Sequence, residues 1–169
     1  MNPPTIRDAA SSDAAAISTI YNQGIVDRIA TLETEERTPE ERRQWLAARE
    51  PRHPVLVAQV GGIVVGWGSL NQFNPRKAYD FVADFSVYVE RAWRGKGVGG
   101  ALLRTLIARA KALGYHKMVL SAFPWNAGGM ALYQKYGFRI AGIYKEQGLL
   151  DGKWVDTIIM EKILTETGG

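Results

Sequence analysis

A glycine-rich turn between a strand-like segment and a long helix-like segment places the tightest constraint on how this chain folds. The β-formers of Ser86–Val89 lead into Arg94–Gly100, which contains four glycines. From Gly97 to Leu113 apolar residues recur at helical spacing, and Gly114 marks the helix end. Such glycines let the backbone approach a ligand and turn successive N–H groups into one concavity, and the following helix adds the positive end of its dipole. The segment therefore predicts a phosphate-binding loop in an α/β protein.

The segments on both sides of this loop alternate between strand and helix patterns. We expect strands at about 5–7, 55–58, 63–67, 78–89, 117–122, 139–144 and 154–163, and helices at about 13–25, 38–50, 97–113 and 126–136. Gly61-Gly62 is typical of a two-residue hairpin, so the second and third strands are expected to be antiparallel. The strands before and after the helix at 97–113 are expected to be parallel, as in other strand–helix–strand crossovers. The sequence therefore predicts a mixed α/β sheet flanked by helices.

Composition indicates a single globular domain that spans residues 1–169. Hydrophobic residues make up 46% and charged residues 22%, which excludes a disordered chain. The longest apolar stretch, Val55–Gly68, is shorter than the ~20 residues that a membrane-spanning helix needs. The segment Met1–Pro4 has neither a basic start nor an apolar core typical of a signal peptide. We therefore expect a cytoplasmic protein that does not bind membranes.

Residues that usually bind metals or nucleic acids are scarce. The absence of cysteine excludes disulfides, thiolate metal sites and a cysteine nucleophile. His53 and His116 are far apart and have no carboxylate cluster nearby, so no metal site is expected. The net charge of +4 favours anionic ligands. No basic run is longer than Arg42-Arg43, so nucleic-acid binding is not predicted.

Two other kinds of phosphate-binding loop fit this segment less well. A Walker loop needs Ser or Thr directly after Gly-Lys, but Gly97 follows Lys96, and Glu90 occupies the place of the first glycine. A dinucleotide-binding fingerprint is matched by Gly95, Gly97 and Gly100, but five residues separate it from the preceding strand. The next predicted strand also lacks the acidic residue that would bind a ribose. A nicotinamide-binding enzyme is therefore the weaker alternative.

The loop does match the pattern Arg/Gln-x-x-Gly-x-Gly/Ala, with Arg94 in the first place. A second block runs from Asn126 to Phe138 and contains Ala131-Leu132-Tyr133-Gln134-Lys135-Tyr136-Gly137. With both blocks in this order, the chain resembles the GNAT superfamily of N-acetyltransferases, in particular its phosphinothricin and amino-acid N-acetyltransferase branch. The resemblance covers about residues 5–163 and includes Tyr21-Asn22, Pro54–Ala58, Arg76–Asp80 and Gly152–Asp156. It implies a mixed, mostly antiparallel twisted sheet flanked by helices.

The resemblance also implies acetyl-CoA as the co-substrate. The pyrophosphate of the coenzyme is expected on the backbone of the loop, and its pantetheine arm along the edge of the preceding strand. Asn126 is expected both to cap its helix and to bind the coenzyme. The expected coenzyme-binding residues are Val87, Tyr88, Val89, Arg94, Gly95, Lys96, Gly97, Val98, Gly99, Gly100 and Asn126.

Two catalytic residues follow from the same resemblance. Asp84 stands where this branch usually has Glu, and it is expected to accept a proton from the acceptor amine, directly or through water. Tyr133 matches a tyrosine that donates a proton to the departing thiolate of coenzyme A. The plainer alternatives are an exposed strand-edge carboxylate for Asp84 and a core aromatic residue for Tyr133. Because the chain has no cysteine to carry an acetyl group, we expect direct transfer.

The expected acceptor is the primary amine of a small amino acid or of an analogue such as phosphinothricin or methionine sulfoximine. Arg76 and Tyr79 match branch positions near the acceptor pocket, where a cation suits a carboxylate or phosphinate. The alternative for Arg76 is a solvated turn. A protein N-terminus is the second candidate acceptor, and a coenzyme-binding module without catalysis is a further alternative. We also expect a homodimer.

Overall fold

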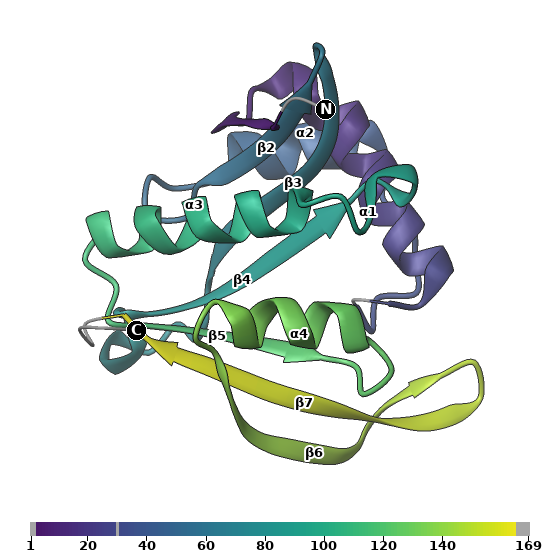
Figure 1. Cartoon of the computed structure of the whole chain (residues 1–169), viewed down its shortest axis with the longest axis vertical. Helices are drawn as coiled ribbons and strands as arrows, with labels where there is room; N and C mark the ends of the chain where they lie inside the picture. Colours follow the sequence, from purple (N-terminus) through teal and green to yellow (C-terminus); the bar gives the residue numbers. More distant parts are fainter. Residues whose placement is uncertain (1–2, 30, 165–169) are drawn as a thin grey trace.

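The described residues form one seven-stranded sheet with the strand order β1-β2-β3-β4-β5-β7-β6 (Figure 1). The computed structural model describes residues 3–29 and 31–164. Within them, every neighbouring pair of strands is antiparallel except β4 and β5. The strands are β1 (Thr5–Asp8), β2 (Val55–Val60), β3 (Ile63–Gln72), β4 (Val82–Val89), β5 (Lys117–Ala122), β6 (Arg139–Leu150) and β7 (Lys153–Ile163). The prediction of a mixed, mostly antiparallel sheet is confirmed.

Helices cover both faces of this sheet. They are α1 (Ala14–Asp27), α2 (Pro39–Ala47), α3 (Val98–Ala112) and α4 (Ala127–Lys135). On one face, α1 and α2 pack around Trp67 of β3; on the other, α3 and α4 pack against Leu56 and Phe85 and lie in front in Figure 1. No helix in the described part of the chain is long and apolar enough to cross a bilayer.

Local sequence signals account for the positions of these helices. The Oγ1 of Thr38 accepts a hydrogen bond from the N–H of Glu41 at 3.1 Å, which caps α2. The Oδ1 of Asn126 caps α4 in the same way, through the N–H of Gly129 at 3.0 Å. Gly68 lets α3 approach β3 closely, because a Cβ there would lie 2.9 Å from a leucine side chain of α3.

β4 and β5 are paired only near their first residues and then diverge (Figure 1). Val82–Asp84 are in register with Lys117–Val119, and no pairing of the two strands extends beyond Asp84. The N–H of Glu90 donates to a carbonyl of β3 at 2.8 Å, so the backbone groups of the even-numbered residues of β4 face β3. The backbone groups of residues 85, 87 and 89 therefore face the opening between β4 and β5.

Three strand boundaries differ from the sequence-based expectation by four residues or more. The strand expected to begin at residue 78 begins at Val82, because Lys77–Tyr79 form a 3₁₀ turn. β3 continues beyond residue 67 to Gln72, where it still pairs with β4. β6 continues beyond residue 144 to Leu150, and two register shifts interrupt its pairing with β7. These shifts break the period-two pattern on which a strand prediction depends.

Candidate active site

Two cavities adjoin β4 where the sheet opens. The first lies on the side of α3 and α4 and has a volume of about 460 Å³. The glycine loop, β4 and the start of α4 line it, together with part of α1. The structure brings together here most of the residues predicted to bind the coenzyme, namely Val87, Tyr88, Val89, Arg94, Gly95, Gly97, Gly99, Gly100 and Asn126, and also Tyr133.

The loop presents backbone N–H groups to this cavity. Gly95 and Gly97 have φ angles of 75° and 88°, in the left-handed region that favours glycine. A Cβ at either position would meet nothing within 4 Å, so the loop surface is open. The N–H of Ala101 donates to the Gly97 carbonyl at 3.1 Å, and the N–H groups before Ala101 have no partner within α3. Free N–H groups at a helix start fit a phosphate.

Arg94 lines the cavity, but its charge is shared with a carboxylate. Its Nη1 lies 2.7 Å from Oδ2 of Asp27 at the end of α1. Asp27 also forms an ion pair with Arg91 at 2.8 Å. Hydrogen bonds from Arg91 and then from Arg94 lower the pKa of Asp27, which stays ionised at neutral pH. The positive charge expected of Arg94 is therefore partly neutralised.

Lys96 and Val98 differ from the other predicted coenzyme-binding residues, because neither lines the cavity. The Nζ of Lys96 lies 5.4 Å from the centre of the Trp93 ring. The side chain of Val98 is buried in the core under α3. The Lys96 residue is exposed on the loop but away from this cavity.

Tyr133 on α4 lines this cavity beside β4. Its ring contacts Phe85 and Phe138 at centroid distances of 5.9 and 6.2 Å. Burial raises the pKa of Tyr133 to about 12, so its phenol is protonated at neutral pH. The ring is thus part of the core contacts and also lines the cavity.

The second cavity has a volume of about 270 Å³ and holds Asp84. Tyr88 lines both cavities and stacks on Trp67 with 4.9 Å between the ring centroids. The other lining residues come from the segment after α1, from β4, from β5 and the residue that follows it, and from β7: Thr31, Leu32, Phe85, Ser86, Ser121, Ala122, Phe123 and Thr157. Tyr88 therefore forms a common wall between the loop side and the Asp84 side of the sheet.

Asp84 is held by one side chain of the neighbouring strand. The Nδ2 of Asn71 donates to its Oδ2 at 3.4 Å. Burial raises the pKa of Asp84 to about 6, against the lowering effects of the Asn71 hydrogen bond and of the Phe85 N–H. Such a carboxylate is ionised at pH 7 and is a much stronger base than an exposed aspartate, whose pKa is near ~3.9.

Sequence reasoning missed several hydroxyl groups that surround Asp84. Thr31, Ser121 and Thr157 all line the second cavity. They lie on segments far apart in the chain and form no motif. Ser121 lies near the end of β5 and Thr157 lies within β7, so only the strand order and register bring them together. A prediction of these residues would have needed the register of the sheet.

The structure places Arg76 and Tyr79 outside both cavities. Arg76 precedes the 3₁₀ turn between β3 and β4 and is exposed. Tyr79 is 38% exposed and packs on Phe73, with 5.4 Å between the ring centroids. Their expected contact with the acceptor stays a prediction.

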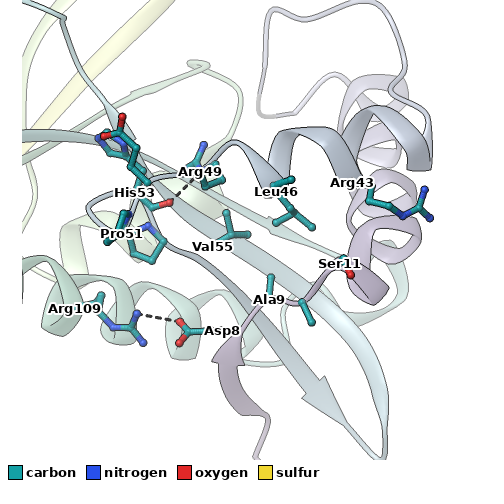
Figure 2. Close-up of a pocket in the computed structure, with 14 residues that line it drawn as sticks. Asp8, Ala9, Ser11, Arg43, Leu46, Arg49, Pro51, His53, Val55 and Arg109 are labelled. Carbon is teal, nitrogen blue, oxygen red and sulfur yellow. Dashed lines mark hydrogen bonds and ion pairs between the residues drawn. The ribbon is translucent and has the colours of Figure 1, made fainter.

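A further cavity of about 490 Å³ lies between α2, α3 and the start of β2 (Figure 2). Two of its basic side chains are paired with acids: Arg109 lies 3.0 Å from Asp8, and Arg43 pairs with Glu40. This cavity contains none of the predicted site residues.

Comparison with known proteins identifies the family of the chain. The acetyltransferase (GNAT) family matches residues 20–138. The chain is 33% identical, over 163 residues, to the L-methionine sulfoximine/L-methionine sulfone acetyltransferase of Salmonella typhimurium, covering 96% of this chain and 95% of that protein. It is 32% identical, over 164 residues, to the phosphinothricin N-acetyltransferase of Alcaligenes faecalis, covering 95% and 82%.

A solved structure gives the same result. The crystal structure of a GNAT superfamily phosphinothricin acetyltransferase from Sinorhizobium meliloti in complex with AcCoA is similar with a TM-score of 0.90 and 31% identity, covering 96% of this chain and 89% of that one. The prediction from the two sequence motifs is confirmed: the chain is an acetyltransferase and belongs to the GNAT family.

Proposed function

We propose that the protein transfers the acetyl group of acetyl-CoA to the primary amine of a small amino acid, or of an analogue of the phosphinothricin or methionine sulfoximine type. The observation that carries this proposal is the common wall at Tyr88, with an open phosphate-binding loop on one side and a small cavity holding a buried carboxylate on the other. The relatives that act on methionine sulfoximine and phosphinothricin support this acceptor class.

The first cavity fits acetyl-CoA, which supplies an acetyl group activated as a thioester. The N–H groups of the loop from Gly95 to Gly100 would hold the pyrophosphate. The backbone groups of Val87 and the N–H of Val89 face the opening and would pair with the amides of the pantetheine arm, as a neighbouring strand would, whereas the Val89 carbonyl already accepts from Arg94 Nε at 3.4 Å. Backbone N–H groups aimed at the thioester carbonyl would stabilise negative charge on its oxygen.

Asp84 would take a proton from the acceptor. An α-amine has a pKa near ~8 and is mostly protonated at neutral pH, so it needs a base before it can attack. Because the pKa of Asp84 is about 6, the carboxylate is available at pH 7 and is lost as the pH falls below 6. The hydroxyls of Ser86, Ser121 and Thr157 would orient the acceptor or a bridging water.

Tyr133 would supply a proton to the leaving group. It lies on the coenzyme side of β4 and is protonated at neutral pH. A thiolate that leaves in this cavity takes up a proton, and the phenol is a donor within the same cavity. In this scheme the base and the acid act on opposite sides of β4.

The volume of the second cavity favours a small acceptor over a protein N-terminus. A thiol-release assay with acetyl-CoA tests this against the twenty amino acids, phosphinothricin, methionine sulfoximine and a short peptide. The highest kcat/KM is expected for a single amino acid or an analogue. Preference for the peptide would contradict the proposed acceptor, and binding of acetyl-CoA without turnover of any amine would indicate a module without catalysis.

We also propose a homodimer that forms through β6. This strand is at one edge of the sheet and exposes Ile140, Ile143, Tyr144 and Leu149. A long edge strand with apolar side chains is a template for pairing with another strand. Light scattering is expected to give twice the mass of the chain, and Ile143→Lys to give a monomer. A monomeric wild type would contradict this proposal.

We further propose that the reaction takes place in the cytoplasm, where acetyl-CoA is available to such an enzyme. Cell fractionation is expected to find the protein with cytoplasmic enzymes, and recovery in the membrane fraction would contradict this.

A further inference from the structure

The side-chain amide of Asn71 connects Asp84 to the guanidinium of Arg49. Asp84 lines the second cavity, which is proposed to hold the acceptor and is called the acceptor cavity below. Asn71 on β3 lies directly opposite Asp84 on β4. Its Nδ2 donates to Asp84 Oδ2 at 3.4 Å and to Ser86 Oγ at 3.3 Å. Its Oδ1 accepts from Arg49 Nη2 and from Ser69 Oγ, both at 3.0 Å. Every hydrogen-bonding atom of this amide therefore has a partner.

Two backbone carbonyls and an aromatic ring hold the Arg49 side chain without neutralising its charge. Its Nε donates to the His53 carbonyl at 3.0 Å (Figure 2), and its Nη2 donates to the Leu70 carbonyl at 2.6 Å. The guanidinium carbon lies 4.5 Å from the centre of the Trp45 ring. Within the described residues, Arg49 has no carboxylate partner. Burial lowers the pKa of Arg49 to about 10, which still leaves it protonated at neutral pH.

The chemistry of these groups permits one orientation of the amide. Arginine has only donors, and an ionised carboxylate has only acceptors. The amide between Arg49 and Asp84 therefore satisfies both only with Oδ1 towards Arg49 and Nδ2 towards Asp84. A reversed amide would instead match a protonated Asp84, whose O–H donates. Arg49 thus determines which form of Asp84 the amide supports.

We propose that Arg49 is a positioning residue for catalysis: through Asn71 it keeps the Asp84 carboxylate ionised and directed into the acceptor cavity. This inference rests on the proposed role of Asp84 as the base. The other titratable or charged groups near Asp84 are Tyr88 on the same strand and the Lys117–Glu161 ion pair (2.7 Å) on β5 and β7. Substitution of Arg49 leaves these groups in place.

The test is the pH dependence of kcat/KM for Arg49→Met, Asn71→Leu and the double variant. Each single variant is expected to raise the midpoint of the acid limb by roughly 0.5 to 1 pH unit, the scale of one lost hydrogen bond. Below pH 6 this shift of the midpoint lowers kcat/KM roughly three- to tenfold relative to wild type, and the difference disappears near pH ~8. The double variant is expected to shift the midpoint no further, because both changes break the same connection.

Further variants separate positioning from a structural role. Arg49→Lys keeps a charged donor and is expected to move the midpoint back towards that of wild type. Arg52→Met is the matched control, since Arg52 also donates to a backbone carbonyl and packs on an aromatic ring, Tyr115, but does not contact Asn71. His53→Gln removes the neighbouring imidazole, whose pKa is lowered by burial. Both controls are expected to keep the wild-type midpoint.

The outcomes distinguish this inference from the function on which it rests. If Asp84→Asn abolishes the acid limb but Arg49→Met keeps the wild-type midpoint, Arg49 does not position the base, and the role of Asp84 stands. If the acid limb persists in Asp84→Asn, the proposed base is wrong, and the inference about Arg49 is wrong with it. A purely structural role for Arg49 would lower the melting temperature and leave the midpoint unchanged.

Discussion

The first cavity, proposed to hold the coenzyme, and the second, proposed to hold the acceptor, share a wall at Tyr88 but are built from different groups. The groups proposed to bind the phosphates on the coenzyme side belong to the backbone of one continuous segment, Arg94–Gly100. The acceptor side is lined by side chains from four separate segments. These side chains include Asp84, Ser121 and Thr157. A site that binds its ligand through backbone groups keeps these groups when side chains other than its glycines are substituted. In a site that binds through side chains, each substitution changes the chemical groups that face the ligand. Coenzyme binding is therefore expected to be robust and acceptor preference to be easily altered.

The largest effect on the coenzyme side is expected from a change that alters the backbone itself. Gly97 has a φ of 88°, which a β-branched residue adopts only with strain, and its position faces open space where a ligand would approach. Gly97→Val is expected to weaken acetyl-CoA binding by roughly 10²-fold. Calorimetry measures this directly, and equal affinity in the variant and wild type would reject the loop as the coenzyme site.

On the acceptor side, the buried carboxylate is expected to reduce stability. The pKa of Asp84 is about 6 in the folded protein, against an ordinary value of 3.8. A raised pKa means that folding favours the protonated form, so the destabilisation is absent below pH 3.8, grows as the pH rises to 6, and is constant above. Asp84→Asn is expected to stabilise the fold by about 1–3 kcal/mol above pH 7 and by nothing near pH 3.5. Urea unfolding at the two pH values checks this, and an equal gain at both would contradict burial of the charge as the cause.

A side chain on the coenzyme side is expected to matter where it takes part in the chemistry. Tyr133→Phe keeps the ring contacts with Phe85 and Phe138 and removes only the phenol proton. A roughly tenfold or greater fall in kcat is expected, with acetyl-CoA affinity unchanged. Steady-state kinetics together with calorimetry separate the two quantities. An unchanged kcat would leave Tyr133 as a core aromatic residue.

The smallest effect is expected from a charged side chain of the loop. Lys96 rests against Trp93 and does not line the cavity. Lys96→Ala removes one solvated charge, so acetyl-CoA affinity is expected to fall by less than about threefold. A loss as large as that of Gly97→Val would show that side chains, and not the backbone, hold the phosphates.

The same difference explains how much of the molecule could be predicted from its sequence. The glycine loop, the cap at Asn126 and the hairpin at Gly61-Gly62 are local, because residues adjacent in the chain determine each backbone shape. The hydroxyls around Asp84 depend on strand order and register, which no local pattern specifies. Arg49 was missed for the same reason, since its contact with Asn71 spans 22 positions. The strand start expected at residue 78 was wrong because β-formers there also fit a short turn.

In the proposed mechanism the coenzyme binds on one side of β4, and Asp84 activates the acceptor on the other. Acetyl-CoA affinity and kcat/KM, measured together on Asp84→Asn, test this mechanism most directly. If Asp84 is the base, coenzyme affinity is expected to stay within about twofold of wild type while kcat/KM at pH 7 falls by roughly 10²-fold or more. The loss is expected to shrink as the pH rises towards the amine pKa of ~8, because free amine then needs no base, and Asp84→Glu is expected to stay active. Turnover of the best acceptor at near wild-type rate at pH 7 would contradict the account, and Glu90 would then be the first alternative base to test.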